Sequence, residues 1–141
     1  MVSSMSLEEF VKTYNGKKVD FDNAFGAQCV DLFRQYVKDV WGINEHTGSC
    51  TTTGGAKDLY FDYSKMEKEK KYFIRSSNKN YIQGDVLIWD KIGNNNFGHV
   101  AIYLGKINNS LIVFEQDGIK QDGAKINIRN KDGLLGYLRK K

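Results

Sequence analysis

The chain has 141 residues, of which 40% are hydrophobic and 27% are charged, with a formal net charge of +4 and no proline. This composition is that of an ordinary globular protein and excludes a disordered chain; since no repeat or linker interrupts it, residues 1–141 are expected to form a single domain. No apolar run reaches the length of a transmembrane helix, and two cysteines could form at most one disulfide, which excludes a disulfide-built scaffold.

Helical patterns occupy the first half of the chain. Residues 4–14 predict a short helix with Ser6 as its N-cap and Glu9, three residues later, completing a capping box. Apolar residues at helical spacing predict a second helix over 27–41, from Ala27 to about Trp41. After a polar loop, residues 55–63 predict a third helix. The charged run KMEKEKKY that follows is interpreted as a solvated surface.

The hydrophobic period changes to two from Tyr81 onward. Short strands separated by Gly, Asn and Asp turns are predicted at DVLIWD, HVAIYLGK, SLIVFEQD, AKINIR and LLGYLRK. Short turns between successive strands imply an antiparallel sheet. Helices followed by such a meander indicate the α+β class.

Three aspartates gather before and within the second predicted helix. When Asp20 is position 1 of a loop, Asp22 and Asp31 are positions 3 and 12, the carboxylate offsets of an EF-hand-type calcium loop, and Gly26 is position 7. The loop departs from that pattern, because position 6 is Phe25 and position 12 is not glutamate. The alternative interpretation is that the aspartates are exposed and cap the helix.

Cys29 falls in the first turn of the second predicted helix, where the positive end of the helix dipole stabilises a thiolate. A cysteine nucleophile also requires a general base. His99 begins a predicted strand, which would hold it rigidly, whereas His46 lies in a polar loop. The alternatives are that His99 is an ordinary core or surface histidine, and that Cys29, His46, Cys50 and His99 form a zinc site without the usual paired spacing. Cys50 by itself is interpreted as a packing residue.

Four motifs in order, GAQCVDL, GDVLIW, GHVAIYLG and FEQDG, resemble the CHAP family of cysteine, histidine-dependent amidohydrolases/peptidases. The resemblance covers residues 15 to 139 and implies a papain-like α+β fold, with N-terminal helices packed on an antiparallel sheet of about five to six strands. It implies that Cys29 is the nucleophile, His99 the base and Glu115 the group that orients the base. Asp117 stands where many members have asparagine, and its charge would raise the pKa of the histidine further.

The predicted hairpin tests this assignment. A two-residue turn at Asn108-Asn109 would put Gln116 on the face of His99, because a one-residue shift of register inverts the faces of a strand. A loop of odd length or a β-bulge would instead bring Glu115 to that face. The resemblance leads us to expect one of these two.

The resemblance also implies a use for the aspartates. Several phage members of the family bind calcium through an Asp-x-Asp before the cysteine and an aspartate just after it. The implied ligands of a structural Ca²⁺ are the side chains of Asp20, Asp22 and Asp31 and the backbone carbonyls of Ala24 and Gly26. The ion would brace the loop before the nucleophile and do no bond chemistry itself.

The family resemblance implies a peptidoglycan hydrolase of the phage endolysin type, either an N-acetylmuramoyl-L-alanine amidase or a peptidoglycan endopeptidase. The Cys29 backbone N–H would form part of the oxyanion hole, with the Gln28 or Asn23 amide as the second donor. The expected partners are bacterial peptidoglycan and anionic wall polymers, which the positive charge suits, with no nucleic acid, no membrane insertion and a monomeric state.

The first ten residues do not have the pattern of a signal peptide. We therefore expect the protein to reach the cell wall from the cytoplasm by a holin-type route, or on a phage particle. Two rival functions remain open from the sequence. One is a calcium-dependent wall-binding module with degenerate catalysis, and the other is an intracellular cysteine protease.

Overall fold

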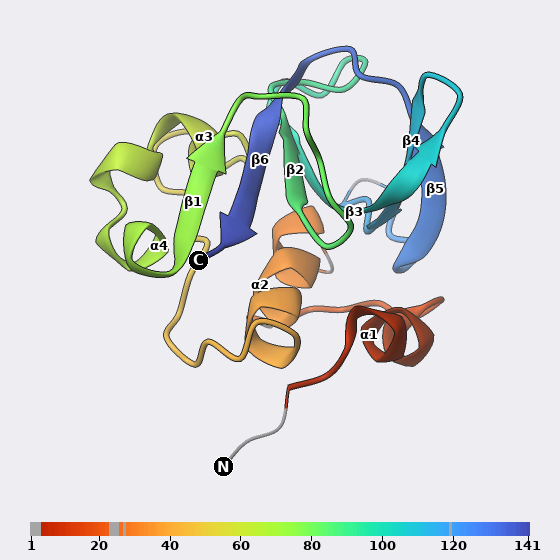
Figure 1. Cartoon of the computed structure of the whole chain (residues 1–141), viewed down its shortest axis with the longest axis horizontal. Helices are drawn as coiled ribbons and strands as arrows, with labels where there is room; N and C mark the ends of the chain where they lie inside the picture. Colours follow the sequence, from red (N-terminus) through yellow and green to blue (C-terminus); the bar gives the residue numbers. More distant parts are fainter. Residues whose placement is uncertain (1–3, 23–25, 27, 119) are drawn as a thin grey trace.

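The computed structural model describes residues 4–22, 26, 28–118 and 120–141, and within them the body of the molecule is a six-stranded antiparallel sheet (Figure 1). The strands are β1 (Phe73–Ser76), β2 (Val86–Trp89), β3 (His99–Ile107), β4 (Ser110–Glu115), β5 (Lys125–Arg129) and β6 (Leu134–Lys140). Across the sheet they follow the order β1-β6-β2-β3-β4-β5. The predicted meander of five strands is confirmed for β2 to β5, whereas β6, which was predicted to continue it, returns to lie between β1 and β2.

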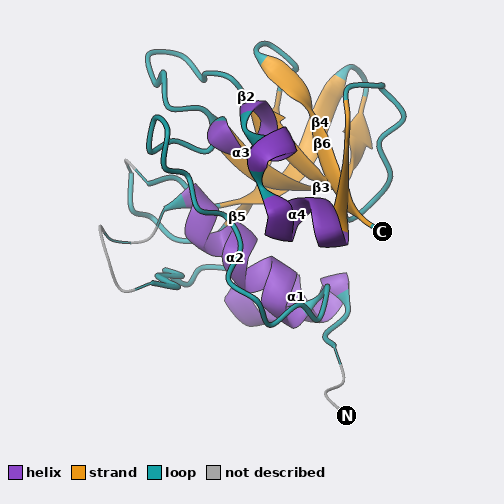
Figure 2. Ribbon diagram, turned by 90° about the vertical axis from the view of Figure 1, so that its left-hand side faces the viewer, coloured by secondary structure: helices purple, strands orange, loops and turns teal. Residues whose placement is uncertain are grey.

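The helices lie at two places around this sheet. They are α1 (Leu7–Tyr14), α2 (Cys29–Asp39), α3 (Asp58–Phe61), the 3-10 turn η1 (Tyr63–Lys65) and α4 (Glu67–Tyr72). Helices α1 and α2 lie together on one side of the sheet, and α3 and α4 lie near its β1 edge (Figures 1 and 2). Among the described residues, no helix is both long and apolar enough to cross a membrane.

The first two predicted helices are confirmed, with small shifts at their ends. In α1 the capping box forms as predicted, because the Glu9 N–H donates to Ser6 Oγ and the Ser6 N–H donates to Glu9 Oε1, both at 3.1 Å. Helix α2 begins at Cys29, while the predicted start, Ala27, lies outside the described residues. It ends before Trp41, whose N–H reaches back five residues to the Tyr36 carbonyl at 3.3 Å.

The third predicted helix is confirmed in part, as the short α3 followed by η1. The interpretation of KMEKEKKY as a solvated surface is confirmed for Lys65, Glu67, Lys68 and Lys71, which are exposed, and is wrong for Glu69. The run contains α4, and Glu69 within it is 4% exposed because its carboxylate accepts the N–H of Gly48 at 2.9 Å. Strand β1, which follows, was not predicted, because only its first residue, Phe73, is buried and a four-residue strand then shows no alternation.

The sheet has two buried faces. One face packs against α1 and α2 through the side chains of Val86, Ile88, Val100, Ile102, Phe114 and Leu138. The opposite face, which we call the far face, carries Leu87, Trp89, Ala101, Tyr103, Leu111, Val113 and Tyr137. Side chains alternate between the two faces along a strand, so His99, two residues before Ala101 in β3, also lies on the far face.

Strands β3 and β4 join through the predicted two-residue turn. Ile107 pairs with Ser110 across it, and Asn108 has φ of 54°, which a turn of this kind requires. The tightness of this turn fixes the pairing at the hairpin end of both strands.

A β-bulge then changes the register of the same two strands. The pairing shifts between Tyr103 and Gly105, so that Leu104 is the extra residue of β3. Because a shift of one residue inverts the faces, Glu115 lies on the same face as His99. The expectation of an odd loop or a bulge is confirmed in its second form.

Helix α1 is fixed to the core by one aromatic side chain. Phe10 is fully buried, and its ring centroid lies 4.8 Å from that of Tyr14, 5.3 Å from that of Tyr36 and 6.0 Å from that of Phe114. These contacts join α1, α2 and β4, so the position of α1 depends on the fit of this ring.

We predict that Phe10→Ala lowers the free energy of unfolding by about 3–5 kcal/mol, because it removes a fully buried ring and leaves a cavity. Phe61→Ala, which truncates a ring that is 52% exposed, should cost no more than about 0.5 kcal/mol. Denaturant unfolding of the two variants measures both values. Equal losses would contradict the role assigned to Phe10.

Candidate active site

A histidine and a glutamate form a buried pair at one end of the hairpin. His99 is the first residue of β3 and Glu115 the last of β4. Their His99 Nε2 and Glu115 Oε1 atoms are 2.9 Å apart, with side chains 5% and 0% exposed. The Trp89 ring packs against the imidazole with its centroid 5.8 Å away. The pair is thereby held in one orientation and shielded from water.

Cys29, the first residue of α2, lies against the other side of this imidazole. Burial opposes protonation of His99, but hydrogen bonds with Cys29 and Glu115 outweigh it and raise the pKa of His99 to about 9. Since Glu115 occupies Nε2, the thiol is left to the Nδ1 side of the ring. The arrangement favours an imidazolium beside the sulfur of Cys29, which lies in the first turn of α2.

Two residues of β5 hold the glutamate, and the sequence analysis did not single them out. Asn127 Nδ2 donates to Glu115 Oε2 at 2.9 Å, while Arg129 donates through Nε to Oε1 and through Nη2, at 2.8 Å, to Oε2. Burial would raise the pKa of Glu115, but the bonds from His99, Arg129 and Asn127 outweigh it and lower that pKa to about 2. Glu115 is therefore a charged, fixed acceptor for the imidazole.

Asp117, the other predicted acidic member, lies in the wall of the same cavity. Its Oδ1 accepts the N–H of Lys120 at 3.3 Å, and the carboxylate bonded to the imidazole is that of Glu115. The structure thus brings Cys29, His99 and Glu115 into contact and puts Asp117 beside them.

Gln116, between the two acidic residues, ties the site together. Its side chain is fully buried and accepts the N–H of Val19 at 2.7 Å, while its Nε2 donates to the carbonyls of Val19 at 2.7 Å and Gln28 at 2.8 Å. These bonds connect the end of β4 to Val19, which precedes Asp20, and to Gln28, which precedes Cys29. The alternation of β4 indicates that Gln116 faces away from Glu115, but only the fold reveals its partners.

The site opens into a cavity of about 570 Å³. Cys29 and His99 lie in its wall, together with glycines 54, 55 and 98 and the side chains of Asn94, Phe97 and Arg129. Gly98 has φ of +85°, and a Cβ at this position would lie 2.6 Å from the carbonyl oxygen of Trp89. Only glycine fits there, so it allows the chain to enter β3 with His99 correctly placed.

One of the predicted oxyanion donors also lines this cavity. The Gln28 backbone N–H donates to Asp31 Oδ2 at 3.0 Å, which leaves its side-chain amide as the candidate donor. The other candidate, Asn23, lies outside the described residues.

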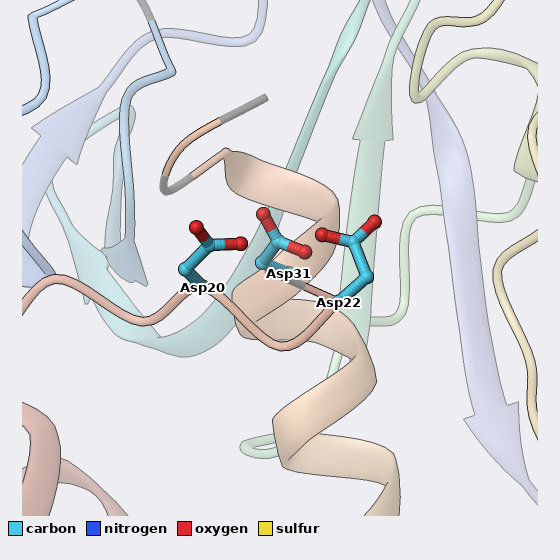
Figure 3. Close-up of side chains that lie close together, drawn as sticks. All are labelled: Asp20, Asp22 and Asp31. Atoms are coloured by element: carbon cyan, nitrogen blue, oxygen red, sulfur yellow. The ribbon is translucent and has the colours of Figure 1, made fainter. Parts of the chain in front are cut away.

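The three predicted aspartates meet beside the N-terminus of α2 (Figure 3). One carboxylate oxygen from each of Asp20, Asp22 and Asp31 lies within 4.8 Å of the others. Among the described residues, Asp20 Oδ1 is a buried oxygen with no hydrogen-bond partner. Such an oxygen is costly to bury unless a cation or donor reaches it. Gly26 has φ of +75°, and Ala24, the other predicted carbonyl ligand, lies outside the described residues.

An arginine that the sequence analysis missed contacts this cluster. Arg34 Nη1 lies 3.1 Å from Asp22 Oδ2 and 3.3 Å from Asp31 Oδ1, and its remaining nitrogens donate to the carbonyls of Thr47 and Gly48. Three carboxylates and one guanidinium leave a net charge of −2, which one divalent cation would neutralise. Burial raises the pKa of Asp31 to about 6, and the neighbouring carboxylates of Asp22 and Asp20 add to the rise, against the Gln28 N–H and Arg34. The donor set therefore fits a divalent, oxygen-preferring ion.

The last candidates from the sequence are the members of the alternative zinc site. Cys29 and Cys50 are both free thiols. Burial, with a smaller contribution from Asp58, raises the pKa of Cys50 to about 12, so it stays protonated. Within the described ranges neither His46 nor Cys50 joins a set of three possible metal ligands, so the zinc alternative has no geometric support there.

The chain matches known proteins both by a family model and by its structure. The family model of the CHAP domain matches residues 18–117. The chain is similar to the endolysin LysIME-EF1, with 20% identity and a TM-score of 0.63 over 96% of this chain and 64% of that chain. It is also similar to Ly7917, solved with the hydrolyzing product of MDP, with 17% identity and a TM-score of 0.67 over 93% of this chain and 60% of that chain. It thus spans about three fifths of their length, and the predicted papain-like α+β fold is confirmed.

We predict that Arg129 controls the pKa of His99 through Glu115. In a Cys29→Ala background the pKa of His99 should fall below about 9, because the thiol no longer contributes. Adding Arg129→Met should raise it again, since the charge of Glu115 is no longer offset, and Arg129→Lys should raise it less. NMR titration measures the shift, and His46→Gln identifies the signal. An unchanged or lower pKa in Arg129→Met would contradict the prediction.

Proposed function

The chain belongs to the CHAP domain family, and from this membership we propose that it is a peptidoglycan hydrolase that cuts an amide bond with Cys29 as nucleophile. The observation that carries the proposal is the buried Glu115–His99 pair in contact with Cys29 at the wall of one cavity. The endolysin among the similar solved structures supports the cell wall as the substrate.

In the proposed reaction the Cys29 thiolate attacks the carbonyl carbon of the amide and forms a tetrahedral adduct. The His99 imidazolium then gives its proton to the departing amine, and a thioester with Cys29 remains. Water attacks the thioester while His99 takes its proton, which releases the carboxylic acid and returns the proton to the imidazole–thiol pair. The proton count balances over the cycle, and the net reaction consumes one water.

Glu115 would serve this cycle without exchanging a proton itself. The low pKa of Glu115, about 2, keeps it charged throughout, so that it holds the Nε2 proton of His99 and fixes the ring with Nδ1 toward the sulfur. Asn127 and Arg129 fix the glutamate in turn. The developing oxyanion would be stabilised by the Cys29 backbone N–H at the start of α2 and by the Gln28 side chain.

We also propose that Asp20, Asp22 and Asp31 hold a structural Ca²⁺. The ion would neutralise the net charge of −2 left after the contacts with Arg34 and give the buried Asp20 Oδ1 a partner. Asp31 connects this cluster to the active site, because its Oδ2 accepts the N–H of Gln28, next to Cys29. The backbone carbonyls of Ala24 and Gly26 complete the proposed ligand set.

The decisive experiment is digestion of purified Gram-positive walls, followed by assay of new amino groups and mass analysis of the released fragments. Fragments with a free L-alanine amino terminus would identify an amidase, and fragments cut within the stem or cross-bridge would identify an endopeptidase. Intact walls after incubation with folded protein would overturn the proposal and favour the binding-module alternative.

We predict that Cys29→Ala lowers the rate of wall digestion by a factor of at least about 10³, because it removes the sulfur in contact with His99 and with it the covalent intermediate. Cys50→Ala should keep most of the activity, since the Cys50 thiol stays protonated and packs beside the core. Turbidity loss of a wall suspension measures both rates. If the two outcomes were exchanged, the nucleophile would be Cys50.

We predict that chelation lowers the melting temperature and that Ca²⁺ restores it more than Mg²⁺, which requires a smaller octahedral site. A hundredfold excess of Ca²⁺ over its Kd should stabilise the fold by about 2.7 kcal/mol. Asp20→Asn is the sharpest variant, because Asp20 Oδ1 has no protein partner within the described residues. Without Ca²⁺, Asp20→Asn should melt no lower than the unsubstituted protein, and added Ca²⁺ should raise its melting temperature by less.

Asp132→Asn, which changes an exposed aspartate elsewhere, serves as the matched control and should keep the full response to Ca²⁺. The calcium proposal fails if chelation leaves the melting curve of protein verified to be metal-free unchanged. It also fails if Asp20→Asn responds to Ca²⁺ as strongly as the control.

A further inference from the structure

A second cavity, of about 340 Å³, lies at the hairpin end of β3 and β4. Its lining includes Lys79, Lys106 and Lys131, together with Asn80, Tyr81 and Tyr103. We call it the lysine cavity. None of its lining residues belongs to the cavity that contains Cys29 and His99.

The three lysines of this cavity carry uncompensated charge. All three are exposed, and within the described part of the chain none of them forms an ion pair or lies over an aromatic ring. The described lining contains no acidic residue. Three like charges around one concavity create a local positive potential that attracts an anion with several charges.

The bulge of β3 helps to build this cavity. In a regular strand Tyr103 and Lys106, three residues apart, would point to opposite faces. The extra residue Leu104 shifts the alternation, so that both line the same cavity on the far face. The bulge at Leu104, which brings Glu115 to the face of His99, thus also brings Lys106 into the same cavity as Tyr103.

The tyrosines of the cavity offer hydroxyl groups more than open ring faces. The Tyr81 ring packs against Tyr103 and Tyr137, each with a centroid distance of 5.7 Å, and Tyr103 is only 8% exposed. Proteins that bind single-stranded nucleic acid display free aromatic faces on which bases stack. The rings here are occupied by one another, which argues against a nucleic acid and leaves polar edges and the Asn80 amide.

We propose that the lysine cavity binds a polyol chain linked by phosphodiesters, the chemistry of anionic wall polymers. The phosphates would pair with Lys79, Lys106 and Lys131, and the polyol hydroxyls would hydrogen-bond to Asn80 and Tyr81. The assignment of this polymer to the cell wall rests on the proposed function, whereas the affinity for the polymer does not.

The position of the cavity gives such binding a use. His99 and Lys106 are seven residues apart on β3, which spans at most about 23 Å at roughly 3.3 Å per residue, because the bulge at Leu104 shortens the strand. A polymer attached to the wall and held at Lys106 would therefore keep the wall within reach of Cys29 and raise its effective concentration at the active site.

The test uses the Cys29→Ala protein, which should bind without cutting, and a synthetic poly(glycerol phosphate) oligomer as the probe. The triple variant Lys79→Gln, Lys106→Gln, Lys131→Gln should bind about tenfold more weakly, and added salt should weaken binding further. A matched control, Lys65→Gln, Lys68→Gln, Lys141→Gln, removes the same charge from exposed positions outside the cavity and should bind within about twofold of the parent. Melting curves verify that both triples are folded, and Lys106→Glu alone provides a second variant.

Three results would overturn the inference: no binding of the oligomer, equal losses in the two triples, or equally tight binding of single-stranded DNA of matched charge. A separate assay with the unsubstituted protein on phosphate-free muropeptides tests the proposed function. If these are not cut while the oligomer still binds through the three lysines, the proposed function fails and the polymer site stands. If they are cut and the oligomer does not bind, the polymer site alone is rejected.

Discussion

The site depends on the register between β3 and β4, which one extra residue sets. A regular hairpin closed by the Asn108-Asn109 turn would turn Glu115 away from His99, because the faces of a strand alternate. The bulge at Leu104 shifts the pairing by one residue, which turns Glu115 toward His99, while Ile107 and Ser110 stay paired at the turn. The bond between Glu115 and His99, and through it the orientation of the ring toward Cys29, follows from this shift.

Burial then makes the charge balance of the site decisive. Glu115 is fully buried and His99 nearly so, and an isolated charge at such a depth would be strongly unfavourable. Each charge has a partner: Arg129 and Asn127 bind Glu115, Glu115 binds His99, and Cys29 lies on the far side of the ring. The low pKa of Glu115 and the high pKa of His99 are two consequences of one network, which keeps the imidazole charged near neutral pH.

The acidic cluster and the active site share structural members, which gives a physical basis for coupling between them. Asp31 belongs to the cluster and also accepts the N–H of Gln28, the residue before Cys29. Gln116 holds the Gln28 carbonyl from the other side and binds Val19, next to Asp20. A change at the cluster would therefore reach the nucleophile through hydrogen bonds from the side chains of Asp31 and Gln116 to the backbone of Gln28, next to Cys29.

The sequence by itself determined the first two helices, the five strands from Tyr81 onward, the α+β class and the residue types of the site, because these depend on local patterns. The capping box at Ser6, the helical spacing before Trp41 and the alternation of the strands are all read within a short window. The motifs around Cys29 and His99 likewise identify a family without coordinates. The short β1 was missed because a four-residue strand with one buried residue shows no alternation, and the buried Glu69 was missed because its partner, the Gly48 N–H, is 21 residues away in the chain. Only the tertiary structure decided which strand supplies Arg129 to Glu115, what Gln116 binds, and that Arg34 shares the charge of the aspartates, because each of these contacts joins segments whose register and distance no local pattern records.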